Sequence, residues 1–155
     1  MEKNSVTVIG AGLAGSEAAY QLATAGFQIY LFEMRPLVQT SAHTTEFFAE
    51  LICSNSLGSN LPDRASGVLK NELRRLGSLL MNIADECELP AGGALAVDRD
   101  LFSEKVTRTL SSHPNIKIIR EEVKEIPSSP TIIASGPLTS TALSKSISEI
   151  TNSNN

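Results

Sequence analysis

The chain has 155 residues, which is enough for one domain with its own core. Its hydrophobic content of 41% and charged content of 19% are those of a globular protein, and its net charge of −4 argues against a basic nucleic-acid surface. No stretch reaches the length of a membrane span, and the first residues lack the apolar core of a targeting peptide. We therefore expect no membrane association and a cytoplasmic location.

A glycine-rich turn follows the first predicted strand. Residues 5–9 are an apolar run, and a helical pattern covers about residues 14–25. Between them lie Gly10, Ala11, Gly12, Leu13, Ala14 and Gly15. The first glycine permits a tight turn, the second admits a pyrophosphate to the backbone, and the third lets the helix pack closely on the strand. The pattern predicts a dinucleotide whose phosphates rest on the free N–H groups of the helix.

The second predicted strand, residues 28–33, ends in Glu33. An acid about 20 residues after the first glycine reaches a ribose 2′-hydroxyl in dinucleotide-binding folds. A carboxylate there would repel a 2′-phosphate, so a ligand of the NADP type is disfavoured. The pattern does not separate FAD from NAD, because both contain adenosine diphosphate. The alternative is a glycine turn with a structural role and no ligand. The preceding strand, the following helix and Glu33 together disfavour this alternative.

Periodicity is lost over residues 36–65, which are rich in Thr, Ser, Asn and Pro and contain a short helical candidate at residues 45–51. A loop of this length is usually functional or disordered. His43 lies in it, and a solvated histidine is a commoner outcome than a site residue. Cys53 follows, and on residue type alone we expect a buried, inert thiol.

A long amphipathic helix is predicted from residue 69. Apolar side chains recur in steps of four and three, which places them on one helix face. They are Leu69, Leu73, Leu76, Leu80, Ile83 and Cys87. Lys70, Arg74 and Arg75 lie away from that face. We interpret Arg74 and Arg75 as an exposed charged face in preference to contacts with RNA phosphates.

The second half of the chain contains another helix and two strands. Phe102, Val106 and Leu110 share a helix face, which Asp98 or Asp100 caps and His113-Pro114 ends. Residues 116–119 read as a strand, residues 123–126 as its continuation or return, and residues 131–134 as a short buried strand.

These elements predict an α/β, Rossmann-like FAD-binding fold, a parallel sheet with flanking helices and the ligand at the carboxyl ends of the strands. We place the FAD-binding domain at residues 1–143, with an inserted segment at about 36–115. Residues 144–155 are a polar tail that we expect to be frayed. No cluster of His, Cys or acids has the spacing of metal ligands, so we predict no metal, and the two cysteines are expected to be free thiols.

Several stretches resemble one family. They are residues 8–19, Glu33-Met34-Arg35-Pro36, the Cys-Ser-Asn-Ser block within residues 48–57, residues 90–99, residues 119–123 and residues 134–140. Together they resemble the folate- and FAD-dependent tRNA (uracil-5-)-methyltransferases. The glycine turn is shared with many flavoproteins, whereas the Cys-Ser-Asn-Ser block and residues 90–99 are more selective.

The resemblance implies an enzyme that takes a one-carbon unit from methylenetetrahydrofolate, carries it on the flavin and delivers a methyl group to C5 of uridine 54 in the tRNA T loop, with NAD(P)H as reductant. It implies that residues 10–15, Glu33, Arg35, Val123 and Gly136 contact FAD. It also reverses the expectation for Cys53, which becomes the catalytic residue beside the flavin.

The chain departs from the family in two respects. Gly58 stands where members usually carry Arg, and members are much longer. We therefore expect a truncated domain with little activity alone, and an uncovered sheet edge and apolar surface that favour association. The alternatives are a non-catalytic nucleotide-binding module and a related flavin-dependent tRNA wobble-uridine modification protein.

Overall fold

The computed structural model describes residues 4–152, and a four-stranded parallel sheet forms its centre. The strands are β1 (Ser5–Ile9), β2 (Gln28–Phe32), β6 (Ile116–Ile119) and β7 (Thr131–Ile133), in the order β6-β2-β1-β7. In the register of the sheet, Val8 lies opposite Leu31 on one side and Ile132 on the other. The predicted Rossmann-like α/β fold and its four strands are confirmed.

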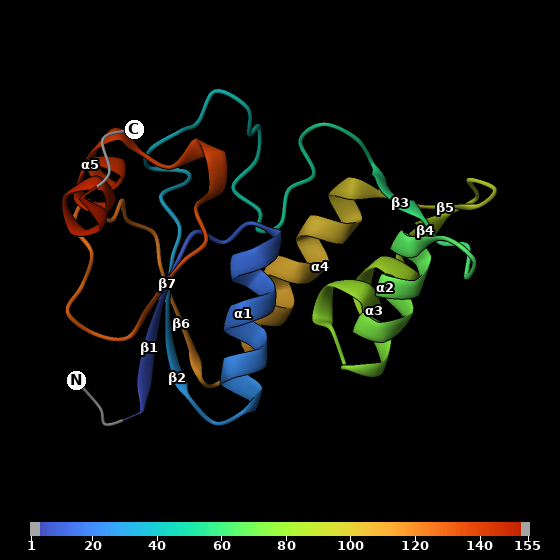
Figure 1. The fold of residues 1–155 in the computed structure, drawn as a ribbon, viewed down its shortest axis with the longest axis horizontal. Helices are drawn as coiled ribbons and strands as arrows, with labels where there is room; N and C mark the ends of the chain where they lie inside the picture. Colours follow the sequence, from blue (N-terminus) through green and yellow to red (C-terminus); the bar gives the residue numbers. More distant parts are fainter. Residues whose placement is uncertain (1–3, 153–155) are drawn as a thin grey trace.

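Two helices, α1 (Leu13–Thr24) and α4 (Arg99–Ser112), lie on one side of this sheet, opposite the side that faces α5 (Thr141–Thr151) (Figure 1). The main core lies between them and the strands. Ile29 and Leu31 of β2 alternate with half-buried neighbours and are fully buried, as are Phe102, Val106 and Leu110 of α4. Burial of each such side chain contributes about 1.5–3 kcal/mol. The predicted apolar face of the second amphipathic helix is confirmed.

The connection from β2 to β6 contains a second, smaller sheet. It is antiparallel, with β3 (Ser56–Ser59), β5 (Ala94–Val97) and β4 (Glu88–Leu89) in the order β3-β5-β4. Helices α2 (Ala65–Arg75) and α3 (Leu79–Glu86) lie with it, at the end of the molecule farthest from α5 (Figure 1). These strands are two to four residues long, and β3 is polar, so the sequence pattern did not predict them.

The prediction of one long helix after residue 69 is wrong, because the chain turns between α2 and α3. Gly77 has φ +74°, and Leu69 and Leu76 are 54% and 75% exposed. The α3 helix starts afresh at Ser78, whose hydroxyl accepts the N–H of Met81 at 3.3 Å. The apolar steps therefore describe two helices, of which the second carries the buried Ile83 and precedes the buried, free Cys87.

Glu17 of α1 joins the two parts of the molecule. Its carboxylate accepts the N–H groups of Leu79 and Leu80 at 3.1 and 3.0 Å, and the Ser78 hydroxyl at 2.8 Å. These N–H groups belong to the first turn of α3 and have no partner within the helix. A negative charge at this end of a helix also interacts favourably with its dipole.

Two cations of α2 make contacts within the chain, and Lys70, which is 6% exposed, donates to the Ser59 carbonyl at 3.0 Å. Arg74 donates to both carboxylate oxygens of Asp85, at 2.7 and 2.6 Å. Lys70 therefore joins α2 to β3, and Arg74 joins α2 to α3. These contacts account for both side chains without an RNA ligand.

Four local predictions need correction. Residues 45–51 form bends and turns and no helix, because the N–H groups of Thr45, Phe47 and Phe48 donate to side chains and that of Ala49 donates to the Ala11 carbonyl. Residues 123–126 form no strand. The β7 strand is at the sheet edge and not buried, with Ile132 and Ile133 36% and 39% exposed. Residues 144–151 are not frayed, because α5 is capped by the Ser140 hydroxyl. Residues 153–155 of the predicted tail lie outside the described residues.

Within residues 4–152, each helix is too short or too polar to cross a membrane.

Candidate functional site

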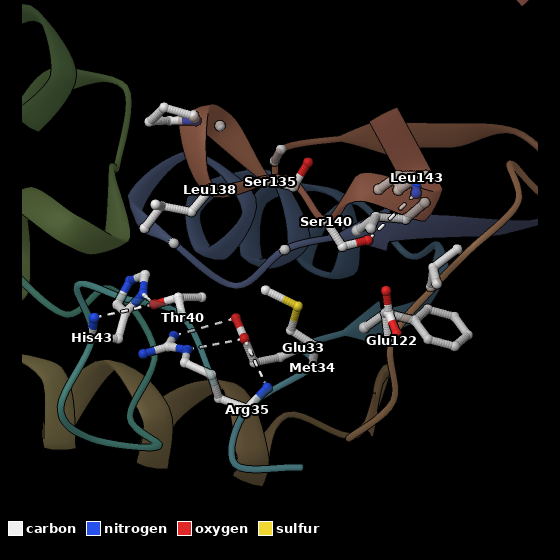
Figure 2. A pocket seen from close by; sticks show the side chains of 18 of the residues that line it. Glu33, Met34, Arg35, Thr40, His43, Glu122, Ser135, Leu138, Ser140 and Leu143 are labelled. Atoms are coloured by element: carbon white, nitrogen blue, oxygen red, sulfur yellow. Dashed lines mark hydrogen bonds and ion pairs between the residues drawn. The ribbon is translucent and has the colours of Figure 1, made fainter. Parts of the chain in front are cut away.

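A cavity of about 330 Å³ opens at the carboxyl ends of β1, β2 and β7. This volume is within the range of small-molecule sites. One side carries Glu33, Arg35, Thr40 and His43, and the other carries Ser135, Leu138 and Ser140 (Figure 2). The cavity therefore occupies the place where open parallel sheets bind ligands.

The glycine turn forms the floor of the cavity, and its glycines are required for different reasons. Gly10 has φ +95°, and a Cβ there would lie 2.9 Å from the Ala134 carbonyl oxygen. A Cβ on Gly15 would collide with the carbonyl oxygen of Gly10. Gly12 has nothing within 4 Å of an added Cβ, and it starts α1 without a side-chain cap. The free N–H groups of α1 thus face open space that can hold an anion.

Glu33 lies beside this turn and is buried. Its Oε2 accepts the Ala11 N–H at 3.1 Å and Arg35 Nη2 at 3.3 Å, and its Oε1 accepts Arg35 Nε at 3.0 Å and the Arg35 backbone N–H at 3.1 Å. Burial alone would raise the pKa of Glu33, but the hydrogen bonds and charge of Arg35 outweigh it and lower the pKa. Glu33 is therefore an ionised acid fixed against the glycine turn.

Arg35 connects Glu33 to the following loop. Its side chain is 1% exposed, and its Nη1 donates to Glu50 Oε2 at 3.0 Å and to the Thr45 carbonyl at 3.2 Å. Glu50 also accepts the backbone and hydroxyl groups of Thr44 and Thr45, which together lower its pKa against the opposing effect of burial. One buried guanidinium thus holds the loop at residues 44–50 against the end of β2.

The opposite wall is made by residues that follow β6 and β7. Glu121, Glu122 and Val123 line the cavity from one segment, and Gly136, with φ +61°, lines it from the other. The Ala134 N–H donates to the Ile9 carbonyl at 2.8 Å, which fixes the second segment to β1. Gly136 is exposed, so the backbone is open to a ligand here.

Most of the predicted site residues meet in this cavity. Gly10, Gly12, Leu13, Glu33, Arg35, Val123 and Gly136 line it. Ala11, Ala14 and Gly15 belong to the same turn and do not line the cavity. Cys53 is an exposed free thiol outside the cavity, although its neighbour Ile52 lines it. The prediction of a buried Cys53 from residue type alone is wrong, because the chain is an exposed loop at this point.

His43 was predicted to be solvated, and this is wrong. It is half-buried, lines the cavity, and its Nδ1 lies 2.7 Å from Thr40 Oγ1. No local pattern identified it, because a single loop histidine has no periodicity and its place depends on the Arg35 contacts. Over residues 4–152, no group of three or more His, Cys, Asp or Glu side chains is arranged to hold a metal ion.

A parallel sheet, a glycine turn before an uncapped helix and an acid at the end of the next strand define an α/β protein of the Rossmann-like dinucleotide-binding fold. The chain belongs to the family described as "Glucose inhibited division protein A", which matches residues 5–152.

Several relatives are named "Methylenetetrahydrofolate--tRNA-(uracil-5-)-methyltransferase TrmFO". The relative from Bacillus subtilis (strain 168) is 60% identical over 151 residues, which are 97% of this chain and 35% of that protein. The relative from Rubrobacter xylanophilus is 57% identical over 145 residues, which are 94% of this chain and 32% of that protein. The chain thus spans about a third of the length of the curated relatives it matches.

A solved structure of Aquifex aeolicus GidA supports the fold. It aligns with 81% of this chain and 21% of its own, with a TM-score of 0.64 and 21% sequence identity.

Proposed function

We propose that this chain is the FAD-binding part of a methylenetetrahydrofolate-dependent tRNA uracil-5-methyltransferase. The observation that carries the proposal is the uncapped start of α1, which opens into the cavity beside Glu33. The identity of 57–60% to relatives named TrmFO supports the particular activity. It also favours this activity over modification of a wobble uridine.

The described residues fit the adenosine diphosphate half of FAD. The space above Gly12 accepts a pyrophosphate on the N–H groups of Leu13 and Ala14. Glu33 is the candidate for the ribose hydroxyls, although Ala11 and Arg35 already donate to it. Because the Arg35 side chain donates four hydrogen bonds to Glu33, Glu50 and Thr45, we assign it a positioning role through Glu33. Val123 and Gly136 would approach the cofactor from the opposite wall.

When bound, the flavin would carry the one-carbon unit from methylenetetrahydrofolate to C5 of uridine 54 in the tRNA T loop, with NAD(P)H as the source of electrons. Cys53 is the candidate catalytic residue, since its thiol is exposed and follows Ile52 of the cavity wall. A thiol needs access to the reacting atoms, and an exposed loop provides it. We place this activity in the cytoplasm.

Titration of the purified chain with FAD tests the cofactor proposal. We expect a yellow protein with flavin absorption, and weaker binding in Glu33→Gln, which keeps the shape of the side chain and removes its charge. Glu46→Gln is the matched control, because Glu46 is exposed and outside the cavity. A colourless protein that does not bind added FAD would show that the proposal is wrong.

Transfer of label from methylenetetrahydrofolate to a T-loop RNA separates an enzyme from a nucleotide-binding module. Two thirds of each relative has no counterpart in this chain, so we expect little transfer by the chain alone. A chain that binds FAD and transfers no label behaves as the module, and addition of the remaining part of a relative should then restore transfer.

A further inference from the structure

The cavity contains a histidine to which the proposed cofactor contacts assign no role. His43 lines the cavity, faces the wall that carries Leu138, and is held by Thr40 (Figure 2). Thr40 Oγ1 makes two contacts with it, accepting the His43 backbone N–H at 3.1 Å and lying 2.7 Å from Nδ1. The ring is therefore fixed at one nitrogen and presents the other, Nε2.

The contact with Thr40 allows either tautomer, because a hydroxyl can donate to a bare Nδ1 or accept from a protonated one. We assign the first arrangement, because Thr40 Oγ1 already accepts the His43 backbone N–H. In this assignment Nδ1 accepts and Nε2 carries the proton. Burial, and then the charge of Arg35, lower the pKa of His43 against the opposing effects of Glu50 and Glu33. His43 is thus a neutral N–H donor at neutral pH.

The acidic side chains of the cavity would repel an anion, so an additional N–H donor would favour anion binding there. Four acids line the cavity: Glu33, Glu50, Glu121 and Glu122. Its lining cation is Arg35, whose guanidinium already donates to Glu33, Glu50 and the Thr45 carbonyl. A pyrophosphate here would meet net negative charge and needs N–H donors beyond those of the helix.

We propose that His43 donates its Nε2–H to a phosphate oxygen of the bound dinucleotide, as a side-chain contact in addition to the N–H groups of α1. This inference rests on the proposed function, because it requires an adenine dinucleotide in the cavity. It makes His43 a binding residue for the phosphates and gives Thr40 the role of orienting its ring.

Competition with FAD tests the inference, with ADP and adenosine as the competing probes. We expect His43→Leu to weaken FAD and ADP about tenfold, the effect of losing one hydrogen bond to a charged group, and to leave adenosine unchanged. His43→Gln keeps an N–H donor and should recover part of the affinity for ADP. His113→Gln is the matched control, since His113 lies at the end of α4 and outside the cavity.

The outcomes separate the two proposals. If the unaltered chain binds neither FAD nor ADP, the proposed function is wrong and the inference falls with it. If it binds both, and His43→Leu weakens ADP and adenosine equally or weakens neither, His43 does not contact the phosphates while the proposed function stands. Unchanged thermal unfolding of the ligand-free variants establishes that they fold, and His43→Ala, which also removes the donor, serves where His43→Leu does not fold.

Discussion

The wall of the cavity formed by residues 33–50 differs from the wall formed by residues 121–143 in how its residues are held. In the first wall, Arg35 is buried between Glu33 and Glu50, and Phe48 and Ala49 are fully buried. Arg120 lies over the Phe48 ring at 4.4 Å and donates to the Arg35 and Glu46 carbonyls. In the second wall, Glu121, Gly136 and Pro137 are exposed.

The difference indicates that the two walls are prepared for a ligand to different degrees. Buried ion pairs fix the first wall before any ligand arrives, at the cost of desolvating three charges. The second wall is shaped by its backbone and by the short edge strand β7. We therefore expect substitutions in the first wall to lower stability strongly, and substitutions in the second wall to change mainly association.

The largest effect is expected from Arg35→Met. Removal of the guanidinium leaves the Glu33 and Glu50 carboxylates without their shared partner, and breaking a buried ion pair costs about 3–5 kcal/mol. Urea unfolding at pH 7 measures it. Arg64→Met is the control, because Arg64 and its ion-pair partner Asp63 are both largely exposed, and such pairs contribute about 0–1 kcal/mol. Equal stability of the two variants would show that the buried ion pairs of Arg35 do not fix the first wall.

Gly15→Ala should follow, because its methyl group collides with the Gly10 carbonyl. Overpacking of this kind costs about 1–3 kcal/mol or more, which exceeds the roughly 1 kcal/mol that Ala gains over Gly in a helix. Gly12→Ala is the matched variant, with ordinary φ and open space around the new methyl group. We expect it to fold normally and to bind FAD more weakly. Unfolding curves and FAD titrations of both variants measure this contrast.

A smaller effect is expected on the pH dependence of stability. The folded chain lowers the pKa of Glu33 below its ordinary value of 4.5, so this stabilisation is complete above about pH 4.5 and is lost as the pH falls through the folded pKa. In Arg35→Met, burial would instead raise the pKa of Glu33, so acidification toward pH 5 should relieve part of the destabilisation. Urea unfolding from pH 7 to pH 4 should show the two proteins converging. A constant difference would mean that Arg35 does not control the ionisation of Glu33.

Ile133→Thr should have the smallest effect on stability. Ile133 is 39% exposed on the edge strand, and surface substitutions usually change stability by about 0.5 kcal/mol or less. The same variant should reduce self-association, because exposed edge strands with apolar side chains favour pairing with another chain. Light scattering across a concentration series measures it. A monomeric parent chain would show that this edge does not promote association.

The fold and the floor of the cavity were predictable because their determinants are local. The glycine turn lies within residues 10–15 between a strand and a helix, and a Cβ at Gly10 or Gly15 would collide with backbone atoms, while Gly12 leaves space for a ligand. Alternating and helical periodicities likewise identified β1, β2, β6 and the apolar face of α4. These patterns depend on neighbours a few residues apart.

The remaining features depend on contacts between distant residues. Arg35 was predicted as a cofactor contact, whereas its geometry depends on Glu50, 15 residues away. The break after α2 depends on Gly77 and on Glu17 far earlier in the chain, while the apolar steps continue through it. His43 reaches the cavity because the loop around it is folded back. Periodicity carries no information about such contacts.

The contact between Glu17 and the start of α3 connects α1 to the antiparallel sheet, because α3 also contacts β5. Glu17 lies little more than one turn after Gly12, so its position follows the uncapped start of α1 closely. A small rotation of α1 on ligand arrival would be passed to α3, and through it to the strands that it contacts. A fluorescent label on the α3 side of the molecule would therefore detect a ligand that binds at the start of α1.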